Sequence, residues 1–415
     1  MAINLEVPKK FKPLAEQAHQ AAEHVFRPNS RKYDIAEHTY PKELDMLASL
    51  LDGMADSGAL GGAGATAGSK DGEKQNGSAP EKDPNAIKNG ANMASVLAVT
   101  EMGWGDVGLL LTMPRQGLGQ AAIAAVATPE QLERFGGRWA AMAITEPEAG
   151  SDSASIRATA DFDEETGEYI LNGEKIFVTS GDRAELIVVW ASLDRSKGRG
   201  AIKSFVVERD NPGLHLDRLE HKLGIRASDT ANFSLKDCRV PKENLLGSPE
   251  IQTAKEGFSG VMKTFDNTRP LVAAMSIGVT RAALERTREL LADAGVTIDY
   301  SIPPAAQVGA AADFIALEAD WEASRLLALK AAWMADNKKP NTVEASISKA
   351  KAGRTGTETC LKCVQLAGTV GYAEDELLEK WARDVKILDI FEGTQQIQQL
   401  VIARQLLHKS SADLK

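Results

Sequence analysis

Apolar side chains recur at mixed three- and four-residue spacing over residues 1–55 and again over 91–135, which predicts amphipathic helices. Between these two stretches, residues 57–90 are rich in Gly, Ser, Ala and charged side chains. That composition is typical of a long flexible loop. We therefore expect an N-terminal all-α domain over residues 1–142, with the loop at 57–90 inserted into it.

The pattern changes after Met142 to short runs of β-branched and aromatic residues separated by turn residues, as in "ELIVVWASL" and "IKSFVVER". Asn172 and Gly173 stand between two such runs in "EYILNGEKIFVTSG", a combination typical of a tight β-hairpin. A helical period does not interrupt this stretch. It predicts a compact antiparallel β domain over residues 143–250.

From residue 251 the helical period returns in long amphipathic segments, with Gly295 and Pro340 as breaks and a last segment that starts at Thr394. Such segments pack as an antiparallel, four-helix-bundle-like domain, here over residues 251–415. The predicted fold class is α+β, with the order helical domain, β domain, helical domain.

Composition and charge exclude some classes of function. The 415 residues carry 48 Lys and Arg against 58 Asp and Glu, a net charge of −10, which argues against a nucleic-acid surface. Apolar runs stay shorter than the roughly 18 residues that span a bilayer, and the N-terminus has no apolar core of a secretory signal. Three cysteines fit a reducing compartment, so we expect a cytoplasmic protein.

Two motifs resemble known sites and are rejected on their context. "GGAGATAG" at 61–68 lacks the strand and helix that a dinucleotide fingerprint requires. Cys360 and Cys363 lie one helical turn apart without two further zinc ligands, so they are interpreted as small apolar residues. The six histidines are scattered, and no metal site is predicted.

The segment "RDVKILDIFEGTQQIQQLVIAR", residues 383–404, places Glu392 among apolar residues and directly before Gly393. An acid at a break between two helical segments is commonly a helix N-terminal residue that favours the dipole. A desolvated carboxylate beside a glycine is also what a catalytic base requires. The segment alone leaves both interpretations open.

Two further stretches offer hydroxyls and open backbone in turn-rich loops. "AMAITEPEAGSD" contains Thr145, Gly150 and Ser151, and "KIFVTSGDR" contains Phe177 and Thr179 just before a glycine turn. Loops of this kind present N–H and O–H groups to a phosphate or to the polar edge of a ring. Each stretch by itself is an ordinary turn sequence.

Taken together, the motifs resemble the acyl-CoA dehydrogenase family. "ITEPEAGSD", "NGEKIFVTSG", "KLGIRASDTANFSLKDCRVPKENLLG", "FDNTRP" and "RDVKILDIFEGTQQIQQLVIAR" occur in the order and spacing of that family. The resemblance runs from about residue 95 to 408, and the α–β–α order is also that of the family's fold. Several motifs in register make the resemblance specific.

The resemblance implies a flavoenzyme that uses FAD to desaturate an acyl-CoA thioester between its α and β carbons, with Glu392 as the catalytic base. It also implies electron transfer to an electron-transfer flavoprotein. The implied FAD contacts are Thr145, Gly150, Ser151, Phe177, Thr179, Thr394 and Gln396, with Gln365 and Gly368 reaching the FAD of a neighbouring subunit. The implied substrate contacts are Ser151, Asp266, Arg269 and Gly393.

The physical requirements of the reaction agree with Glu392 as the base. The α-proton of a thioester is weakly acidic, so its base must be desolvated until its pKa approaches the working pH. Gly393 lets the backbone approach the substrate, where the N–H of Glu392 would hold the developing enolate oxygen. Some members carry the base on the "FDNTRP" segment instead, but that position is Thr268, which cannot remove the proton.

The chain departs from the family at the stretch that serves a neighbouring subunit. Members usually carry Arg-x-x-Phe-Gly after the "TRP" helix, and Ala294 occupies the arginine's place here. The usual Gly-Gly after Gln365 is Gly368-Thr369. In a homotetramer every FAD would then lack that contact, unless Arg286 or Arg288 replaces it.

We therefore expect an FAD-dependent acyl-CoA dehydrogenase that forms a dimer of dimers, either of one chain or with a related subunit that supplies the missing arginine. The alternatives are an acyl-CoA oxidase that passes electrons to O2, and a non-catalytic subunit that supports a partner. The acyl chain length and shape depend on helix packing and are not predicted.

Overall fold

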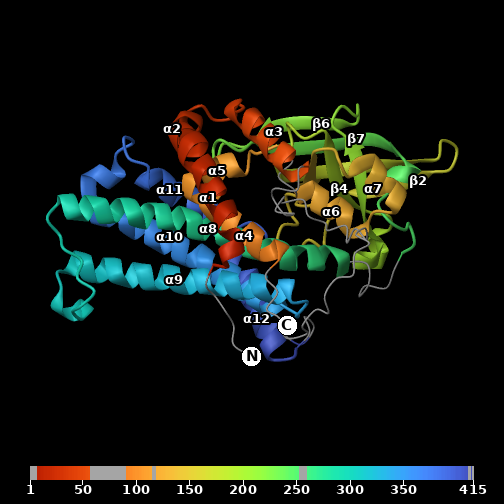
Figure 1. Ribbon diagram of the computed structural model, residues 1–415. Helices are drawn as coiled ribbons and strands as arrows, with labels where there is room; N and C mark the ends of the chain where they lie inside the picture. The colour runs from red at the N-terminus through yellow and green to blue at the C-terminus, as the bar shows by residue number, and fades with distance from the viewer. Residues whose placement is uncertain (1–6, 57–89, 115–117, 252–258, 410–412, 414–415) are drawn as a thin grey trace, which may run out of the picture.

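The computed structural model describes residues 7–56, 90–114, 118–251, 259–409 and 413, and for 50–56 and 259–267 it describes the backbone alone. The loop predicted at 57–90, apart from Gly90, and the motif at 61–68 lie outside these residues. The described chain has helices, then strands, then helices, and Figure 1 shows the β domain at one end and the long helices at the other.

The N-terminal part is helical, as predicted from the apolar spacing. Its α-helices are α1 (Lys12–Ala21), α2 (Arg27–Ile35), α3 (Glu43–Asp56), α4 (Ala91–Gly105), α5 (Val107–Leu110), α6 (Leu118–Val126) and α7 (Pro129–Phe135). Helix α7 begins with a capping box in which Thr128 and Gln131 satisfy each other's backbone N–H groups.

The middle part is one curled sheet. Its strands are β1 (Ala140–Ala143), β2 (Thr159–Asp163), β3 (Glu168–Thr179), β4 (Leu186–Ser192), β5 (Ile202–Glu208), β6 (Leu214–Leu219) and β7 (Thr230–Pro241). The strand order is β1-β4-β2-β3-β7-β6, with β5 on β4. Most pairs are antiparallel, as predicted, but β1 and β2 pair with β4 in parallel, so the sheet is mixed. The long connections that separate these strands in sequence permit parallel pairing.

The predicted hairpin at Asn172-Gly173 is wrong. Both residues lie inside β3, where the register against β7 shifts between Leu171 and Gly173. Gly173 has φ +146° and a Cβ on it would lie 2.7 Å from the Cβ of Ala158, so the glycine serves a bulge and a close contact. The turn between β2 and β3 lies earlier, at Gly167, whose φ is +71°.

The sheet buries apolar side chains on both faces. On one side α6 and α7 place Ile123 and Phe135 against Leu186 and Val188 of β4. On the other side the curl of the sheet encloses a second cluster that contains Phe205. The strands therefore form a rigid support for the loops at their ends.

The C-terminal part is the predicted helical bundle. Its α-helices are α8 (Ser259–Asp293), α9 (Gly309–Asp336), α10 (Thr342–Tyr372), α11 (Leu378–Val385) and α12 (Gln395–Leu406). Gly295 and Pro340 follow the ends of α8 and α9, as predicted for the helix breaks. Cys360 and Cys363 are buried in the core of the bundle, which agrees with their interpretation as small apolar residues.

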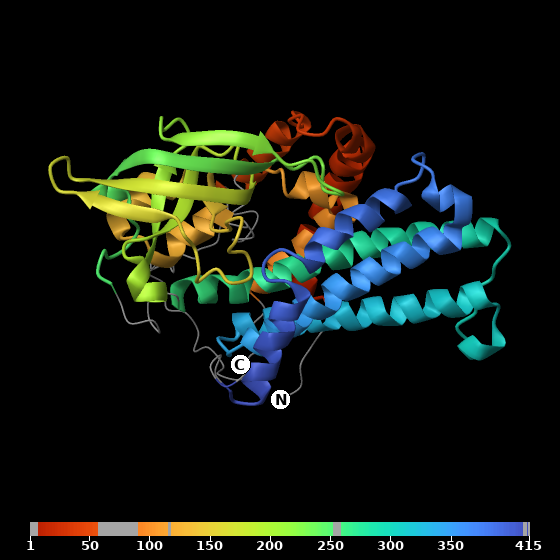
Figure 2. The ribbon, with the colours of Figure 1, turned by 180° about the vertical axis from the view of Figure 1, so that it is seen from behind.

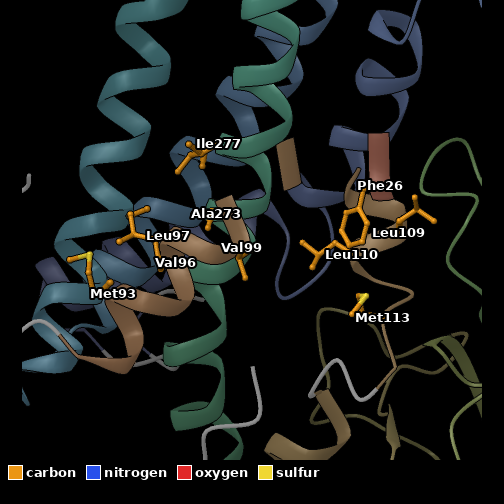
Figure 3. Close-up of a cluster of buried hydrophobic side chains, with 14 of the residues drawn as sticks. Phe26, Met93, Val96, Leu97, Val99, Leu109, Leu110, Met113, Ala273 and Ile277 are labelled. Atoms are coloured by element: carbon orange, nitrogen blue, oxygen red, sulfur yellow. The ribbon is translucent and has the colours of Figure 1, made fainter. Parts of the chain in front are cut away.

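Helix α4 packs along α8 and joins the N-terminal domain to the bundle. Figure 3 shows Leu97 of α4 beside Ala273 and Ile277 of α8, and all three belong to one buried cluster. At Gly278 a Cβ would lie 2.2 Å from the carbonyl oxygen of Thr100, so only glycine permits this helix approach. In both ribbon views the N-terminal half of α8 continues beneath the β domain (Figures 1 and 2).

None of the helices, over the part of the chain that the structure describes, is both long and apolar enough to cross a membrane.

Candidate active site

Glu392 lies in the turn between a short 3-10 helix, Lys386–Asp389, and α12. Helix α12 is capped by Thr394, whose hydroxyl accepts the N–H of Ile397 at 3.3 Å. The N-cap position is therefore taken by another residue, and Glu392 precedes it by two positions. This weakens the interpretation of Glu392 as an ordinary helix-end acid.

The backbone of this turn is left-handed at two successive residues. Glu392 has φ +55° and Gly393 has φ +89°. A non-glycine residue in this region costs about 1–3 kcal/mol and persists only where the surroundings hold it, which is frequent at functional sites. A Cβ on Gly393 would lie 2.4 Å from Nε2 of Gln398, so the turn also requires a glycine there.

The Glu392 side chain turns toward α8. The hydroxyl of Thr268 donates to Glu392 Oε2 at 3.0 Å. Thr268, which occupies the alternative position of the base in the family, therefore hydrogen-bonds to Glu392. Burial raises the pKa of Glu392, while the Thr268 bond and the positive charges of Arg269 and Lys349 oppose the rise. The result is a carboxylate with increased basicity, held at a fixed place.

The structure brings Thr268, Arg269, Glu392 and Gly393 together, since the charge of the buried Arg269 acts directly on Glu392. Asp266 lies in the same helix, but its side chain is outside the described residues. Because this half of α8 runs beneath the β domain (Figure 2), the acid lies where the bundle meets that domain.

The predicted FAD-binding residues of the β domain form a second group. The N–H of Ile176 donates to the carbonyl of Thr145 at 2.9 Å and so ties the two loops together. A Cβ on Gly150 would lie 3.9 Å from the methyl group of Thr145, which places Gly150 beside it. A register shift between Lys175 and Val178 turns Phe177 outward, with φ +59° and 59% of its surface exposed.

A buried ion pair supports this group. Lys175 Nζ lies 2.6 Å from Glu146 Oε1 and also donates to the carbonyl of Ile144 at 3.2 Å. The Glu146 carboxylate accepts the backbone N–H groups of Arg157 and Ala158 as well. Burial lowers the pKa of Lys175 to about 8. The pair fixes the loop that carries Thr145, Gly150 and Ser151.

Sequence reasoning missed this pair, although one signal for it was available. In β3 the alternate positions Tyr169 and Leu171 are buried, and Lys175 falls on the same alternation. A lysine at an inward position of a strand requires a buried acid, and Glu146 is the acid in the neighbouring loop.

The donor set at these loops fits a flavin. Among the residues that the structure describes, the side chains of Thr145, Ser151 and Thr179 make no hydrogen bond. Such hydroxyls, on the same loops and strand ends as the exposed phenyl ring of Phe177, suit a flat heterocycle with a polar edge, as the isoalloxazine of FAD presents.

The remaining predicted contacts are the helix cap beside the Glu392 turn and three exposed residues. The Thr394 hydroxyl is used as the helix cap, and Gln396 is exposed in the first turn of α12. Gln365 and Gly368 are exposed near the end of α10. At 1.5 Å per residue, Gln365 lies about 24 Å and Gly368 about 28 Å along that helix from Lys349, which is level with the Glu392 turn. The structure does not bring these two residues to Glu392.

Glu37 and His38, which are adjacent in the sequence, come together with the distant His221 in the structure. Their ligand atoms lie within 4.8 Å of one another. The Glu37 carboxylate lies 2.8 Å from Nδ1 of His221 and accepts the backbone N–H of Lys222 at 3.0 Å. These bonds connect the segment after α2 with the segment after β6.

The comparisons with known proteins agree with the fold and the motifs. Residues 141–238 match the acyl-CoA dehydrogenase middle-domain model, and residues 255–407 match the acyl-CoA dehydrogenase C-terminal-domain model. The acryloyl-CoA reductase (NADH) of Anaerotignum propionicum is 33% identical over 77% of this chain and 81% of its own length. Subunit CarC of the caffeyl-CoA reductase-Etf complex of Acetobacterium woodii is 37% identical over 68% of this chain and 73% of its own.

A solved structure, that of butyryl-CoA dehydrogenase from Megasphaera elsdenii, superimposes with a TM-score of 0.80 at 30% identity, over 98% of this chain and 100% of that one. The predicted fold is thereby confirmed. The chain belongs to the acyl-CoA dehydrogenase family of FAD-dependent oxidoreductases.

Proposed function

We propose that this chain catalyses the α,β-dehydrogenation of an acyl-CoA thioester, with Glu392 as the base that removes the α-proton. The observation that carries the proposal is the state of the Glu392 carboxylate. It is fixed by the Thr268 hydroxyl, its pKa is raised by burial, and it lies in a strained turn that a helix cap would not need.

The chain's own residues would share the work as follows. Thr145, Gly150, Ser151, Phe177 and Thr179 would hold the flavin at the ends of β1 and β3. When bound, FAD supplies the two-electron acceptor for the hydride that leaves the β-carbon. The remaining work concerns the thioester itself and falls to the turn and to α8.

Glu392 would take the α-proton, and its backbone N–H would hold the thioester oxygen as negative charge develops on it. Gly393 would leave room for the substrate, and Arg269, buried beside the base, would keep the local potential positive. Ser151 and Asp266 remain proposed contacts of the CoA and of the thioester channel.

The physiological direction of the reaction depends on which redox partner exchanges electrons with the flavin. Two relatives are named as reductases, and the same site run in reverse would use protonated Glu392 to deliver a proton to the α-carbon. We favour the dehydrogenase direction with an electron-transfer flavoprotein as acceptor, in a cytoplasmic enzyme of β-oxidation type. Rapid reoxidation of the reduced flavin by air with release of peroxide would instead indicate an oxidase.

The test is the uptake of deuterium at the α-carbon of an acyl-CoA in D2O under anaerobic conditions, together with turnover. Glu392→Gln keeps the shape and removes the basicity, so both rates should fall by about 10²–10⁴-fold while acyl-CoA still binds. Glu358→Gln, on the surface of α10, is the matched control. Rates within a few-fold of the parent for Glu392→Gln would overturn the assignment, and absence of turnover in the parent would favour a non-catalytic subunit.

The substrate panel should begin with butyryl-CoA and extend to longer, branched and steroid-side-chain thioesters. Butyryl-CoA comes first because the similar solved structure is a butyryl-CoA dehydrogenase. Bleaching of the flavin by each thioester measures the preference.

For the assembly we propose a dimer of dimers that includes a related subunit. The arginine that would secure a neighbour's FAD is absent at Ala294, and its two candidate replacements are already engaged within the chain. Arg286 binds Glu376 and Glu289, and Arg288 binds Tyr300 and Glu318. Native mass and flavin counting after co-expression with homologous chains test this. A fully active homo-oligomer with one tightly bound FAD per chain would contradict it.

A further inference from the structure

Lys349 of α10 is a fully buried lysine beneath the turn that carries Glu392. Its ammonium donates to the carbonyl oxygen of Gly393 at 2.6 Å. A buried lysine is rare unless its charge meets a specific partner. Here the hydrogen-bond partner is a backbone carbonyl of the turn rather than a carboxylate.

A second side chain holds the same turn. Nε2 of Gln398, which is also fully buried, donates to the carbonyl of Glu392 at 3.0 Å and to that of Gly393 at 3.1 Å. The two successive left-handed residues of the turn therefore have both carbonyls fixed, one of them by two donors. A conformation that a chain rarely adopts persists when its carbonyls are held in this way.

We propose that Lys349 is a positioning residue, which fixes the Gly393 carbonyl and thereby aims the Glu392 carboxylate at the α-proton of the thioester. The proposal rests on the proposed function, because Glu392 must be the base for its aim to matter. Lys349 itself touches neither substrate nor flavin in this role, and Gln398 is the second support of the turn.

The charge of Lys349 has a second consequence for the base. The charged groups that face Lys349 are Asp389 and Lys386 of the 3-10 helix, Arg269 of α8, and Glu392 itself. Its positive charge lowers the pKa of Glu392 against the effect of burial. Thr268 and Arg269 are the other groups that lower it, so loss of Lys349 leaves these two in place.

The first test is Lys349→Met, which retains the length of the stem and removes both the donor and the charge. We expect α-deuterium exchange and kcat to fall by about 10²-fold, the loss that a misplaced reacting group produces, while KM changes less than about threefold because remote CoA contacts persist. The acidic limb of the kcat/KM pH profile should move to higher pH, because Glu392 loses a positive neighbour. Lys351→Met is the matched control, because Lys351 lies on the same helix α10 but pairs with Asp320 of α9. It should leave the exchange rate, kcat, KM and the pH profile unchanged.

Lys349→Arg and Gln398→Leu keep the proposal testable if Lys349→Met folds poorly. Lys349→Arg keeps a charge and a donor and should recover part of the exchange rate, and Gln398→Leu should lower exchange without moving the acidic limb. FAD content and thermal unfolding of each variant report on folding.

The outcomes separate the two proposals. If Glu392→Gln is inactive and well-folded Lys349→Met exchanges α-protons at the parent's rate with the parent's pH profile, the role of Lys349 is wrong and the base stands. If Glu392→Gln exchanges at the parent's rate, the proposed function itself fails. A fall in stability and FAD content without any shift of the acidic limb would identify Lys349 as merely structural.

Discussion

Replacing Lys175 with methionine is expected to loosen the loop that we propose to hold the flavin. The change keeps the apolar stem in β3 and removes the ammonium that pairs with Glu146 inside the β domain. The carboxylate of Glu146 then stays buried with only the N–H groups of Arg157 and Ala158 as donors. A buried carboxylate without its ammonium partner destabilises the folded conformation of the loop.

The magnitude follows from the burial of the pair. Removing one partner of a buried ion pair costs about 3–5 kcal/mol. The two backbone donors that remain on Glu146 place the expected loss at the lower end, about 3 kcal/mol, against a total stability of about 5–15 kcal/mol. If the whole loss falls on the ordered loop, the affinity for FAD drops by up to about 100-fold.

The assay is denaturant unfolding of parent and variant, with FAD retention measured on the same samples by flavin absorbance. Lys236→Met is the matched control, because Lys236 is an exposed lysine on the adjacent strand β7. A loss below about 1 kcal/mol with unchanged FAD retention would refute the reasoning.

The stability difference between parent and Lys175→Met should also change with pH in a defined direction. The pKa of Lys175 is about 8 in the folded protein, against 10.5 for an ordinary lysine. Between these values the unfolded chain binds more protons at this residue, so its contribution to the free energy of unfolding rises with pH. The difference in stability between parent and Lys175→Met should therefore grow from pH 8 to 10.5, and a difference that shrinks would contradict the assigned burial.

The other predictions concern the base, its turn and the flavin. Thr268→Val removes the hydroxyl that donates to Glu392, so the acidic limb of kcat/KM should shift to higher pH while FAD content stays the same. Gly393→Ala places a Cβ 2.4 Å from Nε2 of Gln398 on a backbone with φ +89°, and turnover should fall at least about tenfold with little change in FAD content. Thr179→Val should weaken FAD binding or shift the flavin spectrum without preventing folding, and an unchanged spectrum and affinity would place Thr179 elsewhere.

The sequence was informative where a residue type is tied to local chain geometry. The helical period predicted the bundle, and Gly295 and Pro340 were correctly read as helix breaks because glycine and proline act on the backbone directly. The hairpin prediction at Asn172-Gly173 was wrong, although it also used a glycine's effect on the backbone. A glycine with a positive φ can serve a turn or a bulge, and the contact with Ala158 that decides between them is made only in the folded sheet.

Glu392 was found through a motif, but the distant groups that set its pKa were not visible in that motif. The apolar residues beside it in the sequence are not all buried around it, since Ile390 is 47% exposed. The hydrogen bond and the positive charges that hold its pKa down against burial come from distant positions, Thr268 and Arg269 on α8 and Lys349 on α10. One sequence cannot show which of many lysines and threonines will meet a given acid.

The Glu392 turn and the proposed flavin loops are supported by different residues, so substitutions should affect them separately. The turn of Glu392 needs a glycine after the acid, a helix cap at Thr394, and donors from Lys349 and Gln398, so it draws on α10 and α12 as well as on its own residues. The flavin group draws on a different support, the Glu146–Lys175 pair within the β domain. Because no described hydrogen bond or ion pair joins the two supports, damage to one should leave the other intact. Variants of Lys349 should therefore retain FAD and lose proton exchange, and variants of Lys175 should lose FAD first.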